Sequence, residues 1–297
     1  MNLDTKQRLE VSPMNDNLRT RPCAICGESS PESFRIFFDG YLKLYRCLTC
    51  GFVSQYPGPG RYTIVEAYED YYSLSFLNKN QEFMYPRRQR GLEDIVGRVS
   101  AFKPAGRLLD VGCGDGFFLS LAQKKGFECW GVEESKPLAG YAASKSGARI
   151  SRGRYSGEMF PKSHFDIITF IQVVEHMPAP REALRIANYH LRPHGLLVIE
   201  VPSLHSPHFL LYQWTGIKRF VRPPDGIIQC HFGYYTPRTL EELTKKAGFQ
   251  KLVLTTGRWQ YKYNGALGEV GKIIDPILNA LGVGGILYIG TKRESTA

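Results

Sequence analysis

The sequence predicts an α/β protein whose main domain is a doubly wound, mostly parallel sheet of seven strands, preceded by a small module with paired cysteines. Two observations favour this fold class. From residue 107 onward, short β-rich segments alternate with segments of helical pattern, and such alternation builds βαβ units on a parallel sheet. Near the N-terminus, four of the seven cysteines form two closely spaced pairs. A chain of 297 residues accommodates one sizeable core and one minor module.

The first residues of the chain are polar. Residues 1–20 are predicted to be a flexible N-terminus, since they lack the apolar run of a signal peptide. No later segment stays apolar for the roughly 18 residues that a membrane-spanning helix needs. We therefore expect a cytoplasmic protein without a transmembrane segment.

The formal net charge of +10 is compatible with nucleic acid, an anionic membrane or a phosphorylated compound as partner. The basic residues occur in small groups separated by neutral or acidic sequence, without the single stripe typical of nucleic-acid surfaces. This distribution disfavours nucleic acid. The apolar segment 268–287 is expected to pack between the last strands, and peripheral contact with a lipid surface is the alternative.

Residues 21–57 are predicted to form a zinc ribbon. Two CxxC pairs, with 20 residues between them, have nearly the spacing of a four-thiolate zinc site. β-rich segments flank Asp39-Gly40, a dipeptide suited to a two-residue hairpin turn. Two disulfides are disfavoured by a reducing cytosol, and four unrelated thiols by the paired spacing. The predicted ligands of a structural Zn²⁺ are Cys23, Cys26, Cys47 and Cys50.

Residues 58–105 are predicted to be a linker followed by a helical segment, with the helix over 81–102. The core is predicted over 106–297, and its expected strands are RLLDVG, ECWGVEE, ARISRG, FDIITFIQVV, GLLVIEV, KLVLTTG and GGILYIGTKR. An insertion rich in proline, histidine and aromatic residues interrupts the core at about 202–235. Insertions of that length are usually functional.

A glycine loop follows the first core strand in LLDVGCGDG, where the chain passes Gly112, Gly114 and Gly116 before the next helix. Glycines let a ligand approach the backbone at the carboxyl end of a strand, where open α/β sheets bind cofactors. A dinucleotide fingerprint would need glycine at position 117, which is Phe117. NAD and FAD are therefore disfavoured.

The second core strand ends in Glu133, about twenty residues beyond the loop, where a carboxylate can accept hydrogen bonds from ribose hydroxyls. A generic turn and a solvated glutamate are the alternatives if each feature is taken alone. Together the two features indicate a Rossmann-like domain with an adenosine-type cofactor.

The motif LLDVGCGDG resembles the first motif of the class I S-adenosylmethionine-dependent methyltransferases, and GVEES resembles the second. FDII, VEHMP and HFGYYTPRTL are similar to segments shared by small-molecule branches of that family. The resemblance covers roughly residues 82–297. It implies S-adenosyl-L-methionine as the methyl donor.

The resemblance also implies roles for particular residues. It places Asp110, Gly112, Gly114 and Asp115 at the methionine end of the cofactor, Glu133 at the ribose, Gly157, Glu158 and Met159 at the adenine, and Gln172 and Val173 at the sulfonium. The zinc ribbon, together with Asp70-Tyr71-Tyr72 after it, partly resembles the sugar C-methyltransferases that act on nucleotide-linked deoxysugars.

Methyl transfer from a sulfonium is an in-line displacement, so the protein aligns the acceptor and removes its proton. Histidine is a natural base near neutral pH, and His231 and His176 are the candidates; a structural role is the alternative for His176. In the insertion, Trp214, Tyr235 and Arg219 are predicted to bind the acceptor. A lid that buries its own aromatic residues, and a solvated charged face, are the alternatives.

Our hypothesis is therefore a methyltransferase acting on an oxygen or carbon of a small polar metabolite, with phosphorylated compounds and nucleotide- or lipid-linked sugars as candidates. An RNA methyltransferase that uses the ribbon to bind RNA is the first alternative. A non-catalytic scaffold is the second.

Overall fold

The computed structural model describes residues 22–37, 42–55, 74–205, 231–257 and 284–293. The predicted mostly parallel sheet of seven strands is confirmed, with strand order β10-β11-β8-β7-β4-β5-β6. Neighbouring strands are parallel except at β11, which runs antiparallel to both β8 and β10. The strands are β4 (Gly106–Val111), β5 (Phe127–Glu133), β6 (Arg149–Arg152), β7 (Phe165–Ile171), β8 (Leu191–Val201), β10 (Phe249–Gly257) and β11 (Gly285–Lys292).

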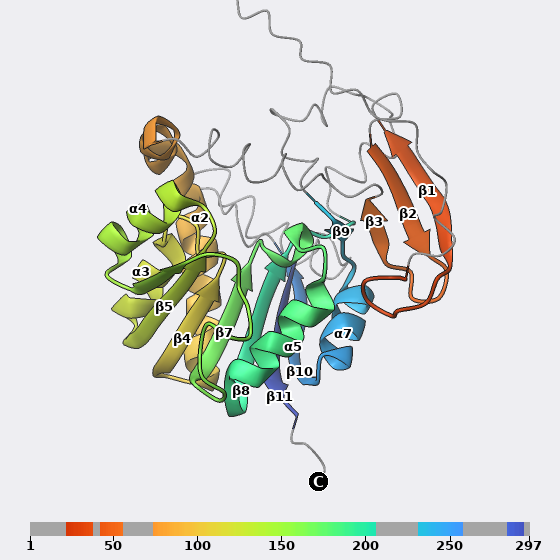
Figure 1. Ribbon diagram of the computed structural model, residues 1–297. Coiled ribbons are helices and arrows are strands. Elements are labelled where there is room, and N and C mark those ends of the chain that lie inside the picture. Colours follow the sequence, from red (N-terminus) through yellow and green to blue (C-terminus); the bar gives the residue numbers. More distant parts are fainter. Residues whose placement is uncertain (1–21, 38–41, 56–73, 206–230, 258–283, 294–297) are drawn as a thin grey trace, which may run out of the picture.

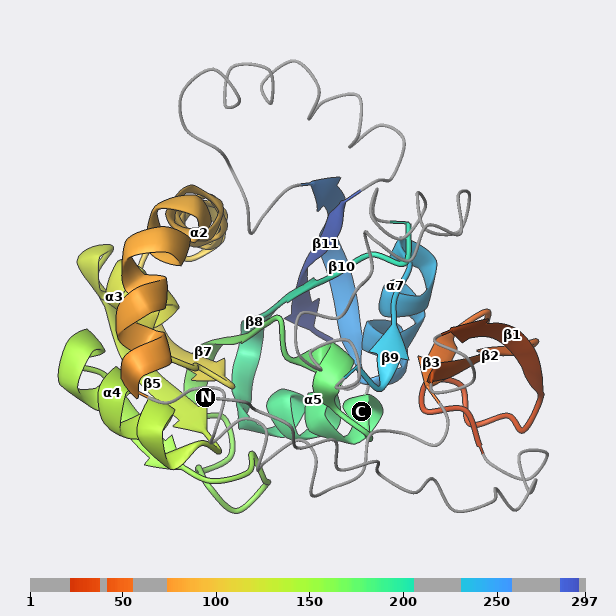
Figure 2. The ribbon, with the colours of Figure 1, turned by 90° about the horizontal axis from the view of Figure 1, so that it is seen from above.

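Helices cover both faces of this sheet, as a doubly wound fold requires (Figures 1 and 2). One group is α2 (Leu74–Phe102), α3 (Phe117–Lys124) and α4 (Lys136–Ser146); the other is α5 (Pro180–His190) and α7 (Pro237–Lys246). Each group packs with a separate set of buried sheet residues, since Leu92 and Leu119 share a cluster with Ile167, whereas Leu184 and Leu240 share another. A short 3₁₀ turn, η3 (Val174–His176), follows β7.

The first helix is longer than the sequence predicted. It begins at Leu74 instead of at residue 81, and no glycine or proline interrupts residues 74–85. Local capping sets the boundaries of two other helices. Thr236 and Thr239 form a reciprocal capping box at the start of α7, and Gly147 ends α4 in the left-handed conformation with φ 67°.

The N-terminal cysteine segment forms its own antiparallel sheet of four strands, in the order β1-β2-β3-β9. Its first three strands are β1 (Pro31–Phe37), β2 (Leu42–Cys47) and β3 (Val53–Gln55), so the predicted hairpin is present. The fourth, β9 (Gly233–Tyr234), comes from the end of the predicted insertion. Figure 1 shows β9 lying between the small sheet and the large one.

This small sheet shares a hydrophobic core with the domain built on the seven-stranded sheet. Ile25 is 0% exposed and belongs to the same buried cluster as Leu184 of α5 and Leu240 of α7. Phe52 is also in that cluster, and Arg181 at the start of α5 donates a hydrogen bond of 3.3 Å to the carbonyl of Ile25. The sequence predicted a module placed ahead of the core, whereas the module packs into it.

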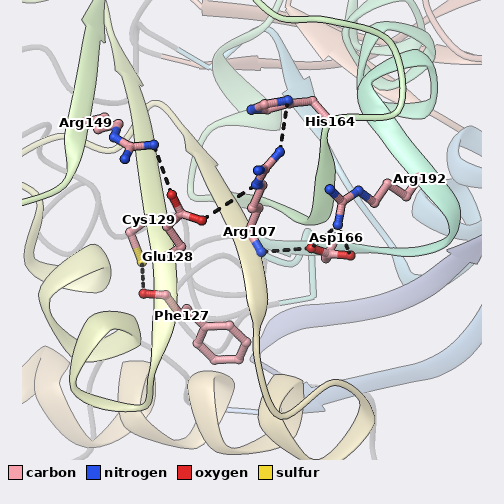
Figure 3. Close-up of polar contacts among 8 residues, drawn as sticks. All are labelled: Arg107, Phe127, Glu128, Cys129, Arg149, His164, Asp166 and Arg192. Atoms are coloured by element: carbon pink, nitrogen blue, oxygen red, sulfur yellow. Dashed lines mark hydrogen bonds and ion pairs between the residues drawn. The ribbon is translucent and has the colours of Figure 1, made fainter.

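Charged side chains join the strands at the amino ends of the parallel sheet (Figure 3). Asp166 accepts hydrogen bonds from the backbone amide of Arg107 at 2.9 Å and from the guanidinium of Arg192 at 3.0 Å. Glu128 pairs with Arg107 at 3.6 Å and with Arg149 at 3.0 Å. These contacts hold the edge opposite the strand ends that carry the glycine loop.

Several predictions fall on segments that the structure does not describe: the flexible N-terminus, Asp39-Gly40, residues 70–72, Trp214 and Arg219 of the insertion, and most of 268–287. Within the residues described, no helix is long and apolar enough to cross a membrane.

Candidate functional site

The glycine loop leaves the carboxyl end of β4 with left-handed backbone at Gly112 and Gly114, where φ is 70° and 56°. A Cβ atom at Gly112 would lie 2.6 Å from Cγ2 of Val173, so the loop and the end of β7 approach too closely for any side chain. At Gly114 no atom of the described residues lies within 4 Å of an added Cβ. The loop therefore has one packed side and one open side.

Glu133, at the end of β5, is bonded to the glycine loop. Its Oε2 accepts a hydrogen bond from the amide of Gly114 at 2.9 Å, and its Oε1 accepts one from the amide of Ser135 at 2.9 Å. The residue is 7% exposed, and burial raises the pKa of its carboxyl despite these two amides. Because a carboxylate oxygen accepts about two hydrogen bonds, each oxygen has capacity for one further donor.

The two aspartates of the motif have contacts within the protein. Asp110 is 2% exposed and accepts a hydrogen bond from Oγ1 of Thr169 at 2.6 Å. Burial, with a smaller contribution from the nearby charge of Glu133, raises the pKa of Asp110 to about 7. Asp115 accepts a hydrogen bond from the amide of Phe117 at 3.0 Å, at the start of α3. Asp110 thus links β4 to β7, and Asp115 holds the end of the loop at the start of α3.

Gln172 and Val173 follow β7, the strand beside β4. Gln172 is held in left-handed backbone with φ 59°, a conformation that costs a residue other than glycine on the order of 1 kcal/mol or more. Two contacts to Glu200 hold it there, because its side-chain amide donates to the carboxylate at 2.6 Å and its backbone amide donates to the carbonyl at 2.8 Å. The surrounding contacts thus hold Gln172 in a strained conformation at the end of a central strand.

The segment with Gly157, Glu158 and Met159 is tied to the fold by a buried histidine. Nε2 of His190 lies 3.1 Å from the carbonyl of Gly157, and Nδ1 lies 2.8 Å from the hydroxyl of Tyr155. A carbonyl only accepts, so Nε2 carries the proton and Nδ1 accepts from the tyrosine. His190, the last residue of α5, therefore anchors this loop.

The two candidate histidines, far apart in the sequence, meet. His176 lies in η3 and His231 precedes β9, and their ring centroids are 4.6 Å apart in an edge-to-face arrangement. Burial, and then the neighbouring His176, lower the pKa of His231 to about 3. At neutral pH His231 is therefore uncharged, and it is a weak base in this environment.

Glu175 lies beside this pair, although its role was not predicted. The residue is 1% exposed, and neither carboxyl oxygen has a hydrogen-bond partner within the described part of the chain. Its Oε1 is 3.9 Å from Nε2 of His176. Only its place inside the VEHMP segment drew attention to it, because a glutamate is normally read from sequence as a solvated side chain.

Of the three residues predicted to bind the acceptor, Tyr235 is the one described. Its side chain is 0% exposed, with the ring 5.2 Å from that of Phe52 and the hydroxyl 3.4 Å from the carbonyl of Val174. Tyr235 is thus part of the core between the small sheet and η3. An aromatic residue near the end of an insertion was interpreted as pocket lining, but here the pairing of β9 with β3 draws it inward.

The four paired cysteines converge. Their sulfur atoms all lie within 4.8 Å of one another, with Cys23 to Cys50 at 3.6 Å and Cys26 to Cys47 at 3.5 Å. Both knuckles have the same turn, in which the glycine after the second cysteine donates to the carbonyl of the first at 2.9 Å and 2.8 Å. A zinc ion with four sulfurs at about 2.3 Å sets those sulfurs about 3.8 Å apart, so the cluster fits the ion closely.

A cavity of about 360 Å³ lies where the cysteine module meets the large domain. Gln55 and Arg46 line it from the module, and Met177, Arg185 and Phe232 line it from the domain. Gln55 is 8% exposed, and its Oε1 has no hydrogen-bond partner among the residues described. The sequence did not predict this cavity, because its walls come from segments far apart in the chain.

Comparisons with known proteins agree with this architecture. The model of a methyltransferase-domain family matches residues 84–254, more than half of the chain. A ubiquinone biosynthesis O-methyltransferase of Leptothrix cholodnii is 26% identical over 133 residues, which cover 42% of this chain and 55% of the relative. The corresponding protein of Ruegeria pomeroyi is 32% identical over 149 residues, covering 48% and 60%.

The chain thus spans little more than half the length of these curated relatives. A solved structure from Thermotoga maritima, described as a SAM-dependent methyltransferase and possible histamine N-methyltransferase, matches with a TM-score of 0.52 and 18% identity, covering 77% of this chain and 100% of that one. At that identity the likeness concerns the fold alone. From the family match, and with the glycine loop and acidic strand end in place, the chain belongs to the S-adenosylmethionine-dependent methyltransferases.

Proposed function

We propose that this protein transfers a methyl group from S-adenosyl-L-methionine to an oxygen atom of a small molecule. The observation that carries the donor half of the proposal is the link from Glu133 to the amide of Gly114, which joins the ends of two neighbouring parallel strands. The curated relatives, named as O-methyltransferases, support oxygen as the acceptor atom.

The cofactor would lie on the open side of the glycine loop, where no atom of the described residues comes within 4 Å of a Cβ added at Gly114. Glu133 would accept hydrogen bonds from the ribose hydroxyls with its remaining lone pairs, and Gln172 and Val173 would border the sulfonium. Asp110, Gly112 and Asp115 would border the methionine end of the cofactor, and the segment from Gly157 to Met159, anchored by His190, would border the adenine. When bound, the cofactor supplies an activated methyl group.

We further propose that His176 and His231 act on the acceptor. Support comes from their mutual contact, with ring centroids 4.6 Å apart, and from the hydrogen bond of 2.9 Å that the amide of His176 donates to the carbonyl of Val173. The cavity beside the cysteine module would admit the acceptor, since its lining residues Met177 and Phe232 are the sequence neighbours of the two histidines. The module would then be one wall of the acceptor site.

The cysteine cluster would hold a structural Zn²⁺. Four thiolates at the observed sulfur spacings complete a tetrahedral shell, which leaves no position for a substrate. The ion would fix the two knuckles, one of which carries the buried Ile25. Metal analysis of protein purified without added metal should give about one tightly bound zinc per chain for such a closed site.

The experiment that tests the function has two stages. Calorimetry first measures binding of S-adenosyl-L-methionine, and release of S-adenosylhomocysteine is then measured with phenolic and catecholic small molecules, linked sugars and RNA as acceptors. Methylation of a small molecule at oxygen supports the proposal. Transfer only to RNA, or cofactor binding that never leads to transfer, would replace it with one of the two alternatives.

A further inference from the structure

The surroundings of Glu175, His176 and His231 have a feature that base catalysis does not explain. The potential ligand atoms of all three residues lie within 4.8 Å of one another. Two of them come from η3 and the third from the segment before β9, which the backbone bond from the amide of Phe232 to the carbonyl of Glu175 holds at 2.7 Å. The cluster is therefore fixed by the fold.

The carboxyl of Glu175 is the second observation. Two other buried carboxylates at this edge are bonded, Glu133 to two backbone amides and Glu200 to the side-chain amide of Gln172. Glu175 is equally buried, and both of its oxygens lack a hydrogen-bond partner within the described residues. Burying an unbonded polar group is costly, so such an atom in a native fold calls for a specific explanation.

We propose that Glu175, His176 and His231 bind a divalent transition-metal ion. One carboxylate and two imidazoles form a donor set that suits Zn²⁺, Fe²⁺ and Mn²⁺, and a cation would satisfy the oxygens of Glu175. Three protein ligands leave coordination positions for water or an acceptor oxygen, unlike the closed shell of four cysteines. The site is thus of the open type that takes part in reactions.

The metal site deepens the proposed function and, in its catalytic part, rests on it. An acceptor hydroxyl bound to the ion would give up its proton to solvent water near neutral pH, as metal-bound water does, so a strong protein base beside the acceptor would not be needed. Its oxygen would then form a bond to the methyl group while the bond from that group to the sulfonium breaks, which releases S-adenosylhomocysteine. The acceptors that such a site favours are compounds with two adjacent oxygens, because both can bind one ion. His231 would then be a ligand in place of the base predicted from sequence.

Metal binding is tested on the full chain with its cysteine site loaded with zinc. Cobalt(II) is titrated by calorimetry and followed by absorption, where a site without sulfur ligands lacks the charge-transfer bands of thiolate-bound cobalt. We expect one equivalent bound without those bands, and at least about 100-fold weaker binding in Glu175→Gln and His231→Ala. His205→Ala, which changes an exposed histidine outside the cluster, is the matched control and should bind cobalt like the wild type.

Circular dichroism and urea unfolding establish that each variant is folded. The proposal would be overturned if the wild-type protein bound no cobalt(II) at such a site, or if both Glu175→Gln and His231→Ala bound it as the wild type does. Glu175 would then be a buried, protonated acid. Cobalt binding without any methyl transfer would instead support the metal site and contradict the proposed function. The two ideas therefore fail through different measurements.

Discussion

At the scale of single residues, the proposed function gives Glu133 two roles. Its carboxylate accepts hydrogen bonds from the amides of Gly114 and Ser135, and the same oxygens would also accept hydrogen bonds from the ribose hydroxyls. Such a residue would preorganise the cofactor site, because the protein itself supplies the bonds that shape the loop.

We predict that Glu133→Ala weakens binding of S-adenosyl-L-methionine by about 10- to 100-fold, because hydrogen bonds to a charged group contribute about 1.5–3 kcal/mol. The variant should also unfold more easily by about 1–3 kcal/mol, since two amides lose their partner. Calorimetry and urea unfolding measure the two effects. Glu128→Ala, at the opposite edge of the sheet, is the control and should leave cofactor affinity unchanged.

His190 is a second residue whose structure yields a test. Burial lowers the pKa of His190 from the ordinary 6.5, because the protonated ring would lose solvation. The unfolded chain therefore binds more protons than the folded one below about pH 6.5, and folding stability falls as the pH is lowered, by at most about 1.4 kcal/mol per pH unit. Above that range the neutral ring contributes its full stabilisation.

We predict that His190→Gln lowers the free energy of unfolding by about 1–3 kcal/mol at pH 7.5, through loss of the bonds to Tyr155 and Gly157. The difference from wild type should shrink at pH 5.5, where only the wild type has a buried imidazole to keep neutral. Urea unfolding at both pH values measures it. A difference that stays constant with pH would contradict the assignment.

At the scale of elements, the two-residue strand β9 connects the cysteine module to the large domain. It pairs with β3 and so joins the cysteine module to the chain just ahead of α7. Gly233 lies against the ring of Phe52, where an added Cβ would be 2.6 Å from Cζ. The ring of Phe52 therefore lies so close to β9 that only glycine fits at position 233.

We predict that Gly233→Ala destabilises the protein by about 1–3 kcal/mol, as overpacking of a core usually does. Gly97→Ala is the matched control: that glycine lies inside α2 with nothing within 4 Å of an added Cβ, so the change should stabilise by up to about 1 kcal/mol. Thermal and urea unfolding compare the two. Equal effects of both substitutions would show that the contact with Phe52 carries no constraint.

The elements also show how far the sequence was informative. The strands and helices of the large domain were predictable because each has its own periodicity and boundary signals, as in the strand ending at Glu133 or the helix capped by Thr236. The pairing of β9 with β3 was not, since two residues have no periodicity and their partner lies far away in the sequence. Tyr235 was misjudged for the same reason.

The candidate site likewise has parts that were predictable from the sequence and parts that were not. The glycine loop and Glu133 follow local motifs, and the paired cysteines follow a spacing rule, so all were found from sequence. The meeting of His176 with His231 was only partly expected, and the buried state of Glu175 was not predicted. Burial and missing hydrogen-bond partners depend on tertiary packing, which local sequence does not encode.

At the scale of the whole molecule, the cysteine module and the methyltransferase domain share one hydrophobic cluster. Ile25, between Cys23 and Cys26, is fully buried in the cluster that also contains Leu184 and Leu240. The zinc ion proposed for the four cysteines would fix the knuckle that carries Ile25. Loss of that zinc should therefore destabilise the core of the large domain as well. Separate domains would behave differently, each unfolding at its own temperature.

We predict that a strong chelator lowers the melting temperature of the entire protein, in a single transition, and that readdition of zinc restores it. Ile25→Ala should lower the free energy of unfolding by about 2–5 kcal/mol, again in one transition, while the variant still binds zinc. Scanning calorimetry measures both, and Leu48→Ala is the control because Leu48 lies at the second knuckle with 64% of its surface exposed. Chelation could instead produce two transitions, with an early one for the module and an unchanged one for the domain. That result would show that the shared core does not couple the module to the domain.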